Sequence, residues 1–325
     1  MRSRVGSPRA LKVSVSSSIS TYVDISMPSS QGKPRSVFPG YIVKEWACSP
    51  AREGGLMDIP LVTKGDPGHP AILFLHGAGV SGWMWEAQME PLSSRYHCLA
   101  VDLPGFGENT AAPWVSLAHM AEQLARLVEA RTRTGTAHVV GLSLGGHLAL
   151  RLLADHPRVC GDVIVSGVTT QPFSSPRAMR LMYAALMRVS TTKVVLQMSA
   201  RAMKIPAAYM ERFLEDMRTS SPVVLKAVFE ELLGSRLPEA LGAASGFDGA
   251  AHRVLAVAGS REHPKIRAEL PDFTRLIPGA WAARVPDAGH SWNVEYPELF
   301  TRMIDDWLGG HQLTPGLVRV EASAA

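Results

Sequence analysis

Long apolar runs are absent from this sequence of 325 residues. No stretch approaches the roughly 20 apolar residues that a membrane-spanning helix needs, so we expect no membrane span. Cysteine is scarce as well, because the chain has only Cys48, Cys98 and Cys160, which are widely spaced. This set fits neither a disulfide framework nor a metal site, and it favours buried free thiols in a reducing compartment.

Charge of one sign is not gathered into patches either. The formal net charge is +4, but lysine and arginine are scattered and form no stripe interleaved with aromatic residues. We therefore expect no nucleic-acid partner. Hydrophobic residues make up 46% of the chain and charged residues 19%, which excludes a wholly disordered protein.

Acidic residues are missing from the start of the chain until Asp24, and serine and arginine are abundant there. We expect residues 1–38 to be a disordered extension, since so little apolar surface cannot offset the entropy of ordering. An organellar transit peptide and a start codon assigned too early are the alternatives. No apolar segment of the secretory kind is present. The expected location is the cytoplasm, or an organelle if this segment is a transit peptide.

From Gly40 onward, short apolar runs alternate with helical patterns. The runs predict strands over 41–46, 59–63, 71–75, 98–101, 138–142, 163–166, 254–258 and 281–285. Helical spacing predicts helices over 117–131, 144–154, 178–189, 192–203, 207–218, 223–233 and 297–308, and one after Pro264. Because parallel strands need crossover connections, this order predicts an α/β fold with a mostly parallel, doubly wound sheet.

The alternation of strands and helices stops between Thr169 and Ala244, where only helical patterns occur. We expect a core formed by residues 39–168 and 249–312, with a helical cap over 169–248 inserted before the last two strands. Residues 313–325 are expected to be a flexible tail. The cap is rich in methionine, which favours an adaptable apolar lid over a hydrophobic substrate; plain core packing is the alternative.

The motif Gly141-Leu142-Ser143-Leu144-Gly145 fits the G-x-S-x-G pattern, between a predicted strand and a predicted helix. A sharp turn at this place holds the serine in a strained backbone conformation, and glycine at the flanking positions avoids clashes. The helix N-terminus favours negative charge that develops nearby. Ser143 is therefore the candidate nucleophile.

A serine hydroxyl needs a base to remove its proton. His290 follows the last predicted strand, on a loop beside glycine and before the closing helix, and it is the candidate base. The competing histidines lie on a loop turn or on helices: His76, His119 and His147. Glu262 is the only carboxylate on the loop after the strand 254–258, which makes it the candidate acid that orients His290. Asp248 and Asp287 are the alternative acids.

Two backbone N–H groups are needed for the oxyanion of a tetrahedral intermediate. We assign them to Leu144, which follows the nucleophile, and to Ala78, on the loop after the strand 71–75. Trp83, Met182 and Met187 are candidate substrate contacts. Asp102, a tempting extra carboxylate, is interpreted as a structural turn residue.

Together these residues resemble the α/β-hydrolase superfamily, in its esterase and lactonase branch. Five motifs carry the resemblance: HGAGVSGWMW (76–85), DLPGFG (102–107), GLSLGG (141–146), GSRE (259–262) and AGHSWNVEYPELF (288–300). It implies the α/β-hydrolase fold, a triad of Ser143, His290 and Glu262, and no cofactor or metal. Glu262 stands where aspartate is commoner. Ser143 stands where related dehalogenases and epoxide hydrolases carry aspartate, which argues against both activities.

The sequence thus predicts a serine hydrolase that cleaves a small-molecule carboxylic ester or lactone through an acyl-enzyme on Ser143. Acyl transfer, thioester hydrolysis and carbon–carbon bond hydrolysis use the same triad and remain open. So does a ligand receptor that keeps the fold and hydrolyses its ligand slowly.

Overall fold

A computed structural model describes residues 58–174, 193–242 and 248–321, which contain one sheet of eight strands. The strand order is β1-β3-β2-β4-β5-β6-β7-β8. Neighbours from β3 to β7 are parallel, while β1 and β8 pair antiparallel with β3 and β7 at the two edges. The strands are β1 (Leu61–Lys64), β2 (Ala71–Leu75), β3 (His97–Val101), β4 (Ala137–Leu142), β5 (Cys160–Ser166), β6 (Val254–Gly259), β7 (Trp281–Val285) and β8 (Val318–Val320). The predicted α/β class with a mostly parallel sheet is confirmed.

Helices fill the connections between these strands, except the short turn from β1 to β2. They are α1 (Glu86–Leu92), α2 (Leu117–Arg131), α3 (Leu144–Asp155), α5 (Lys193–Ala202), α6 (Met210–Thr219), α7 (Pro222–Gly234), α8 (Pro264–Glu269), α9 (Asp272–Leu276), α10 (Trp292–Glu295) and α11 (Pro297–Gly310). Proline at the first position starts α7, α8 and α11, where its missing N–H costs nothing. None of the helices in the described part of the chain has the length and apolar character to cross a membrane.

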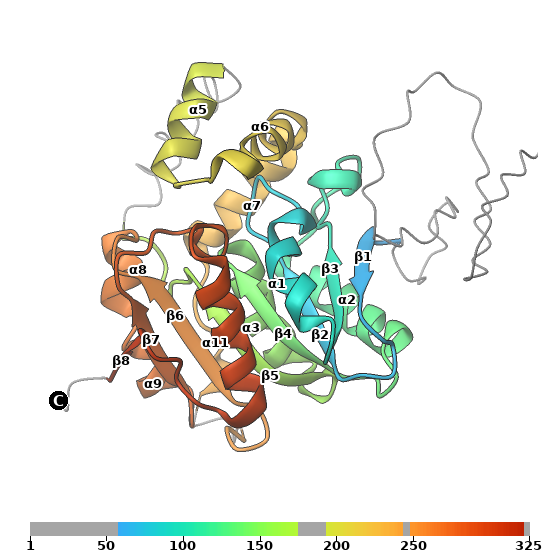
Figure 1. Cartoon of the computed structure of the whole chain (residues 1–325), viewed down its shortest axis with the longest axis vertical. Coiled ribbons are helices and arrows are strands. Elements are labelled where there is room, and N and C mark those ends of the chain that lie inside the picture. Colours follow the sequence, from blue (N-terminus) through green and yellow to red (C-terminus); the bar gives the residue numbers. More distant parts are fainter. Residues whose placement is uncertain (1–57, 175–192, 243–247, 322–325) are drawn as a thin grey trace, which may run out of the picture. The chain divides into compact units, whose positions relative to one another are not determined.

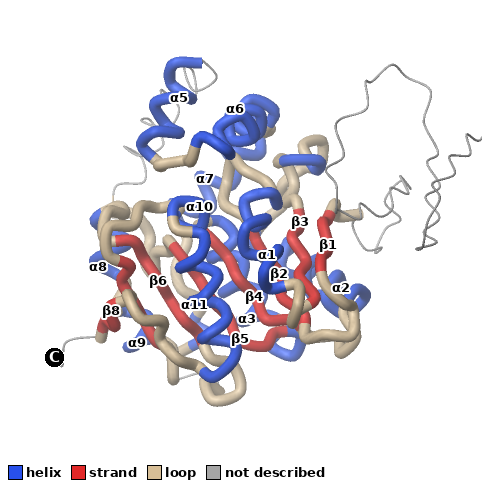
Figure 2. The backbone as a smooth tube through the Cα atoms, in the orientation of Figure 1, coloured by secondary structure: helices blue, strands red, loops and turns tan. Residues whose placement is uncertain are grey.

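Both faces of the sheet are covered, which explains the uninterrupted apolar runs in the sequence. Successive side chains of a strand point to opposite faces. In β2, Leu73 and Leu75 pack with α2 and α3, whereas Ile72 and Phe74 pack with α1 and α11. Accordingly α1 and α11 lie in front of the sheet in Figure 1, and α2 and α3 lie behind it. Figure 2 shows the strands as one twisted row between these helices.

Two regions of the sequence prediction need correction, and three other predictions lie outside the described residues. Val318–Val320 forms β8 within the predicted flexible tail, so three strands, not two, follow the helical insertion. This strand is too short and polar for an apolar signal; one contact that supports it is Arg319, whose guanidinium lies 4.0 Å from the centre of the Trp281 ring. The helix predicted over 207–218 starts as a 3₁₀ turn and becomes α6. The strand over 41–46, the helix over 178–189 and the extension over 1–38 lie outside the described residues.

The segment between β5 and β6 contributes α5, α6 and α7, and one face of α6 binds the loop after β2. The Asp216 carboxylate accepts hydrogen bonds from Ser81 Oγ at 2.7 Å and from Trp83 Nε1 at 2.6 Å. Arg212, one helical turn earlier, pairs with Glu86 at 2.5 Å. Burial is the main cause that raises the pKa of Asp216 to about 6, against the lowering effect of its two donors. This polar face fixes α6 next to the loop that follows β2.

Candidate active site

Ser143 occupies the sharp turn between β4 and α3. Its φ is +55° and its ψ is −113°, a conformation that non-glycine residues rarely adopt and that costs about 1–3 kcal/mol. The turn is held by the Ser143 N–H, which donates to Ser166 O at 2.8 Å, and by the Ser143 carbonyl, which accepts from His147 N at 3.0 Å. These two hydrogen bonds therefore hold Ser143 in its strained backbone conformation.

Close backbone approach explains the two glycines of the motif. A Cβ atom on Gly145 would overlap the carbonyl of Leu75, and one on Gly141 would overlap the backbone of Gly145. The nucleophile turn can pack between β2 and α3 only because both positions lack a side chain. This is the local geometry that the pentapeptide predicts.

His290 and Glu262 come together from two loops, after β7 and after β6. His290 Nδ1 lies 3.4 Å from Glu262 Oε1, and the Glu262 side chain is fully buried. Burial lowers the pKa of His290, but the interaction with the nearby Glu262 carboxylate outweighs burial and raises it above its usual value. The alternative acids have other roles or places: Asp248 accepts from the N–H groups of its own turn, and Asp287 is exposed.

Backbone hydrogen bonds join the two loops that carry this pair. Arg261 N donates to Ala288 O at 3.0 Å, and Asp287 N donates to Ser260 Oγ at 2.8 Å. Gly167, directly after β5, has a φ of +69°, and a Cβ there would lie 2.6 Å from His290 Cε1. Sequence reasoning missed Gly167. The sequence feature that could have indicated it is a glycine at the end of the strand that neighbours β4. At such a position the side chain of a catalytic loop can pass close to the backbone.

The loop after β2 is oriented by His76. Leu103 N donates to His76 Nε2 at 2.9 Å, so the ring proton is on Nδ1, which donates to Gly77 O at 2.7 Å. Burial lowers the pKa of His76 to about 4 and keeps the ring neutral. This bond fixes the Gly77–Ala78 peptide unit, to which Ala78 contributes the N–H. Leu144 begins α3, so its N–H has no acceptor within the helix.

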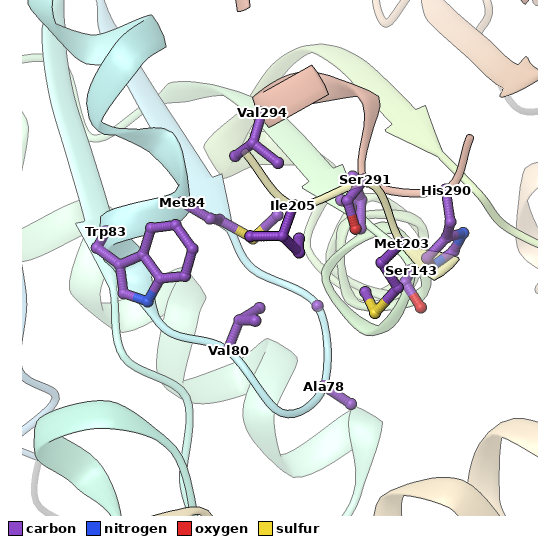
Figure 3. Close-up of a pocket in the computed structure, with 12 residues that line it drawn as sticks. Ala78, Val80, Trp83, Met84, Ser143, Met203, Ile205, His290, Ser291 and Val294 are labelled. Atoms are coloured by element: carbon purple, nitrogen blue, oxygen red, sulfur yellow. The ribbon is translucent and has the colours of Figure 1, made fainter. Parts of the chain in front are cut away.

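Ser143, His290 and Ala78 line one small apolar cavity of about 30 Å³. Figure 3 shows Ser143 and His290 at one end of it and Trp83 at the other. Trp83, a predicted substrate contact, stacks on Tyr209 with ring centres 5.4 Å apart. Most of the remaining wall is apolar and comes from residues that were not predicted as substrate contacts: Val80, Met84, Leu142, Met203, Ile205 and Val294. Met182 and Met187, the other predicted contacts, lie outside the described residues.

The competing polar residues have structural partners elsewhere. Burial lowers the pKa of His147 to about 4, and its Nδ1 lies 3.2 Å from Ser235 Oγ. Asp102 accepts from Gly82 N at 2.7 Å and from Glu108 N at 2.9 Å, as a turn residue does. Among the described residues, no three His, Cys, Asp or Glu side chains form a group that could hold a metal ion.

Two of the three thiols fall within the described ranges. Cys98 and Cys160 are free and buried, and burial raises the pKa of each to about 12. Such thiols are not reactive at neutral pH. Cys48 lies outside the described residues.

Both the sequence and the fold of this chain resemble those of known hydrolases. Residues 72–303 match the alpha/beta hydrolase family. An AB hydrolase superfamily protein of Gibberella zeae is 28% identical over 261 residues, which cover 77% of this chain and 84% of that protein. A thermophilic esterase from Thermogutta terrifontis has a TM-score of 0.65 at 23% identity, covering 77% of this chain and 93% of its own. The enol-lactonase from Burkholderia xenovorans LB400 has a TM-score of 0.62 at 21% identity, covering 77% and 96%.

Proposed function

The chain belongs to the alpha/beta hydrolase family, and we propose that it is a serine hydrolase that cleaves a carboxylic ester or lactone through an acyl-enzyme on Ser143. One observation carries the proposal. The strained Ser143 and the His290 imidazole, which is paired with a buried carboxylate, line the same apolar cavity. A serine becomes nucleophilic when such a base is within reach, and a family member with this constellation has the parts for acyl chemistry.

In the proposed reaction, His290 takes the proton of Ser143 as Oγ attacks the substrate carbonyl. The N–H groups of Ala78 and Leu144 stabilise the oxyanion, and one such donor is typically worth about 3 kcal/mol. Collapse of the intermediate breaks the ester bond, and His290 gives its proton to the departing alkoxide. Water, activated by the same imidazole, then attacks the acyl-enzyme and releases the acid.

The role of Glu262 is to hold the His290 ring and to stabilise its charged form. The raised pKa of His290 supports this role, because the base becomes more effective when its conjugate acid is stabilised. The base must be neutral to accept a proton. We therefore expect kcat/KM to fall as the pH drops below the pKa of His290, at a value above the ordinary 6.5.

The cavity beside Ser143 is small and apolar, and we propose that it holds a short, apolar acyl group. We propose that residues 169–248 act as a cap, because Met203 and Ile205 contribute to this cavity from the insertion. The expected substrate is a small, hydrophobic ester or lactone, and the proposed reaction requires no cofactor.

The test is steady-state hydrolysis of p-nitrophenyl esters from acetate to decanoate by the wild type and by Ser143→Ala. Ser94→Ala, an exposed serine on the same chain, is the matched control. The wild type and the control should hydrolyse short esters, and Ser143→Ala should lose most of the rate. Product analysis with added alcohols or thiols separates hydrolysis from acyl transfer. If no ester reacts, or Ser143→Ala matches the wild type, the proposal is wrong.

A further inference from the structure

Glu295, at the end of α10, has an unusually full set of partners for a residue outside the proposed triad. Its Oε2 accepts from Gly289 N at 2.9 Å. Its Oε1 lies 2.8 Å from Arg261 Nη2 and 2.9 Å from Lys204 Nζ. The carboxylate side chain is 10% exposed, so these partners replace most of its hydration.

Each partner of Glu295 is the neighbour of a residue in the candidate site. Gly289 precedes His290 and Arg261 precedes Glu262 in the chain. Lys204 stands between Met203 and Ile205, which line the cavity beside Ser143. One carboxylate thus connects the base loop, the acid loop and the helical insertion.

The backbone of Lys204 is itself in a strained conformation. Its φ is +54°, in the left-handed region, which costs a non-glycine residue about 1–2 kcal/mol. The turn is held by Lys204 N donating to Arg201 O at 3.1 Å and by Ile205 N donating to Ala200 O at 2.9 Å. With Lys204 bound to Glu295, its neighbours lie at the cavity, as Figure 3 shows for Met203 and Ile205.

Glu295 stays ionised in the range where His290 titrates. Burial raises the pKa of Glu295, but the Gly289 N–H, Lys204 and Arg261 together outweigh burial, and the pKa lies below its usual value. Both cations therefore face a full negative charge. The side chains of Lys204 and Arg261 are 39% and 42% exposed, so either can be changed without opening the core.

We propose that Glu295 is a positioning residue that couples the place of the insertion, through Lys204, to the loop that carries His290. The inference rests on the proposed function for its kinetic consequence. When Lys204 is bound, the Glu295 carboxylate is fixed and holds the Gly289 amide. When Lys204 is lost, Glu295 keeps only the exposed Arg261 as a cationic partner, and the His290 loop becomes less well ordered.

The first experiment follows amide hydrogen exchange in the full-length protein, over peptides that cover 286–296. The variants are Lys204→Met and Lys204→Arg, with Lys226→Met as an exposed control on α7. Lys204→Met should speed exchange of the amide of Gly289 or its neighbours at least severalfold, although position 204 is remote in sequence. Lys204→Arg and Lys226→Met should leave exchange unchanged. Unchanged exchange in Lys204→Met overturns the coupling, whether or not the protein hydrolyses esters.

The second experiment measures kcat and KM on a short p-nitrophenyl ester for Lys204→Met, Glu295→Gln and the double variant. A small misplacement of a catalytic group can cost up to about 100-fold in rate. We expect kcat to fall about tenfold in Glu295→Gln and less in Lys204→Met, with KM changed less than twofold in both. The double variant should be no slower than Glu295→Gln, because Lys204 acts through Glu295. Effects that multiply, or a wild-type kcat in Glu295→Gln, overturn the inference; an inactive wild type overturns the proposed function instead.

Discussion

Replacement of Glu262 by aspartate tests how the acid acts on His290, because it keeps the charge and shortens the reach. One methylene fewer moves the carboxylate back by about 1.5 Å, so the distance to His290 Nδ1 grows from 3.4 Å to about 5 Å. At an effective dielectric constant of about 20, the attraction of the imidazolium for the carboxylate falls from about 5 to about 3.3 kcal/mol. The difference, about 1.5 kcal/mol, corresponds to roughly a tenfold change in rate.

The assay is the pH dependence of kcat/KM on a short ester, from pH 5 to 9, for the wild type and Glu262→Asp. The pKa of His290 is raised by Glu262, so weakening this interaction should move the acid limb to lower pH. The plateau should fall about tenfold, since the imidazolium formed in the transition state is less stabilised. Glu298→Asp, an exposed residue of α11, is the control. An acid limb that stays in place, or moves to higher pH, would refute the electrostatic role assigned to Glu262.

Three further variants test packing and charge around the site. Gly145→Ala places a methyl group on the Leu75 carbonyl, and urea unfolding should give a stability loss of about 2 kcal/mol or more; an unchanged midpoint contradicts the packing. Because the pKa of Asp216 rises from 3.8 to about 6 on folding, its ionisation costs the folded state about 3 kcal/mol above pH 6 and nothing below pH 4. Asp216→Asn, whose carbonyl can keep both hydrogen bonds, should therefore raise the thermal midpoint at pH 7 and not at pH 4; a lower midpoint at pH 7 contradicts this. Met203→Ala should shift the best p-nitrophenyl ester to a longer acyl chain, and an unchanged optimum removes Met203 from the acyl pocket.

Strands buried on both faces were predictable with the most accurate bounds. The run over 71–75 coincides with β2, and the run over 254–258 ends one residue before β6 does; both strands are buried throughout. The reason is physical: helices cover both faces, so nearly every strand residue is apolar and the run ends where burial ends. The helix 117–131 was equally clear from its apolar residues at helical spacing, and the structure adds that Ser116 caps α2 by accepting from His119 N.

Features that depend on partners distant in sequence were not predictable. β8 is too short to carry an apolar pattern and exists through its pairing with β7. Met203 and Ile205 lie at the cavity because a left-handed turn at Lys204 brings them there, and no local signal specifies this turn. From the sequence alone, Glu295 cannot be distinguished from an ordinary exposed charged residue of a helix. Its role is apparent only when Lys204 and Arg261 are seen converging on it.

The insertion contacts the candidate site from two sides, which bears on how substrate preference can change. On the side of the loop that follows β2, Asp216 binds Ser81 and Trp83, and Met217 packs so closely on Gly79 that a Cβ there would lie 2.7 Å from its sulfur. On the side of the base, Lys204 binds Glu295. A substitution confined to Met203 alters the cavity wall and leaves the contacts of Asp216 and Lys204 in place. We therefore expect it to change substrate specificity with little loss of kcat.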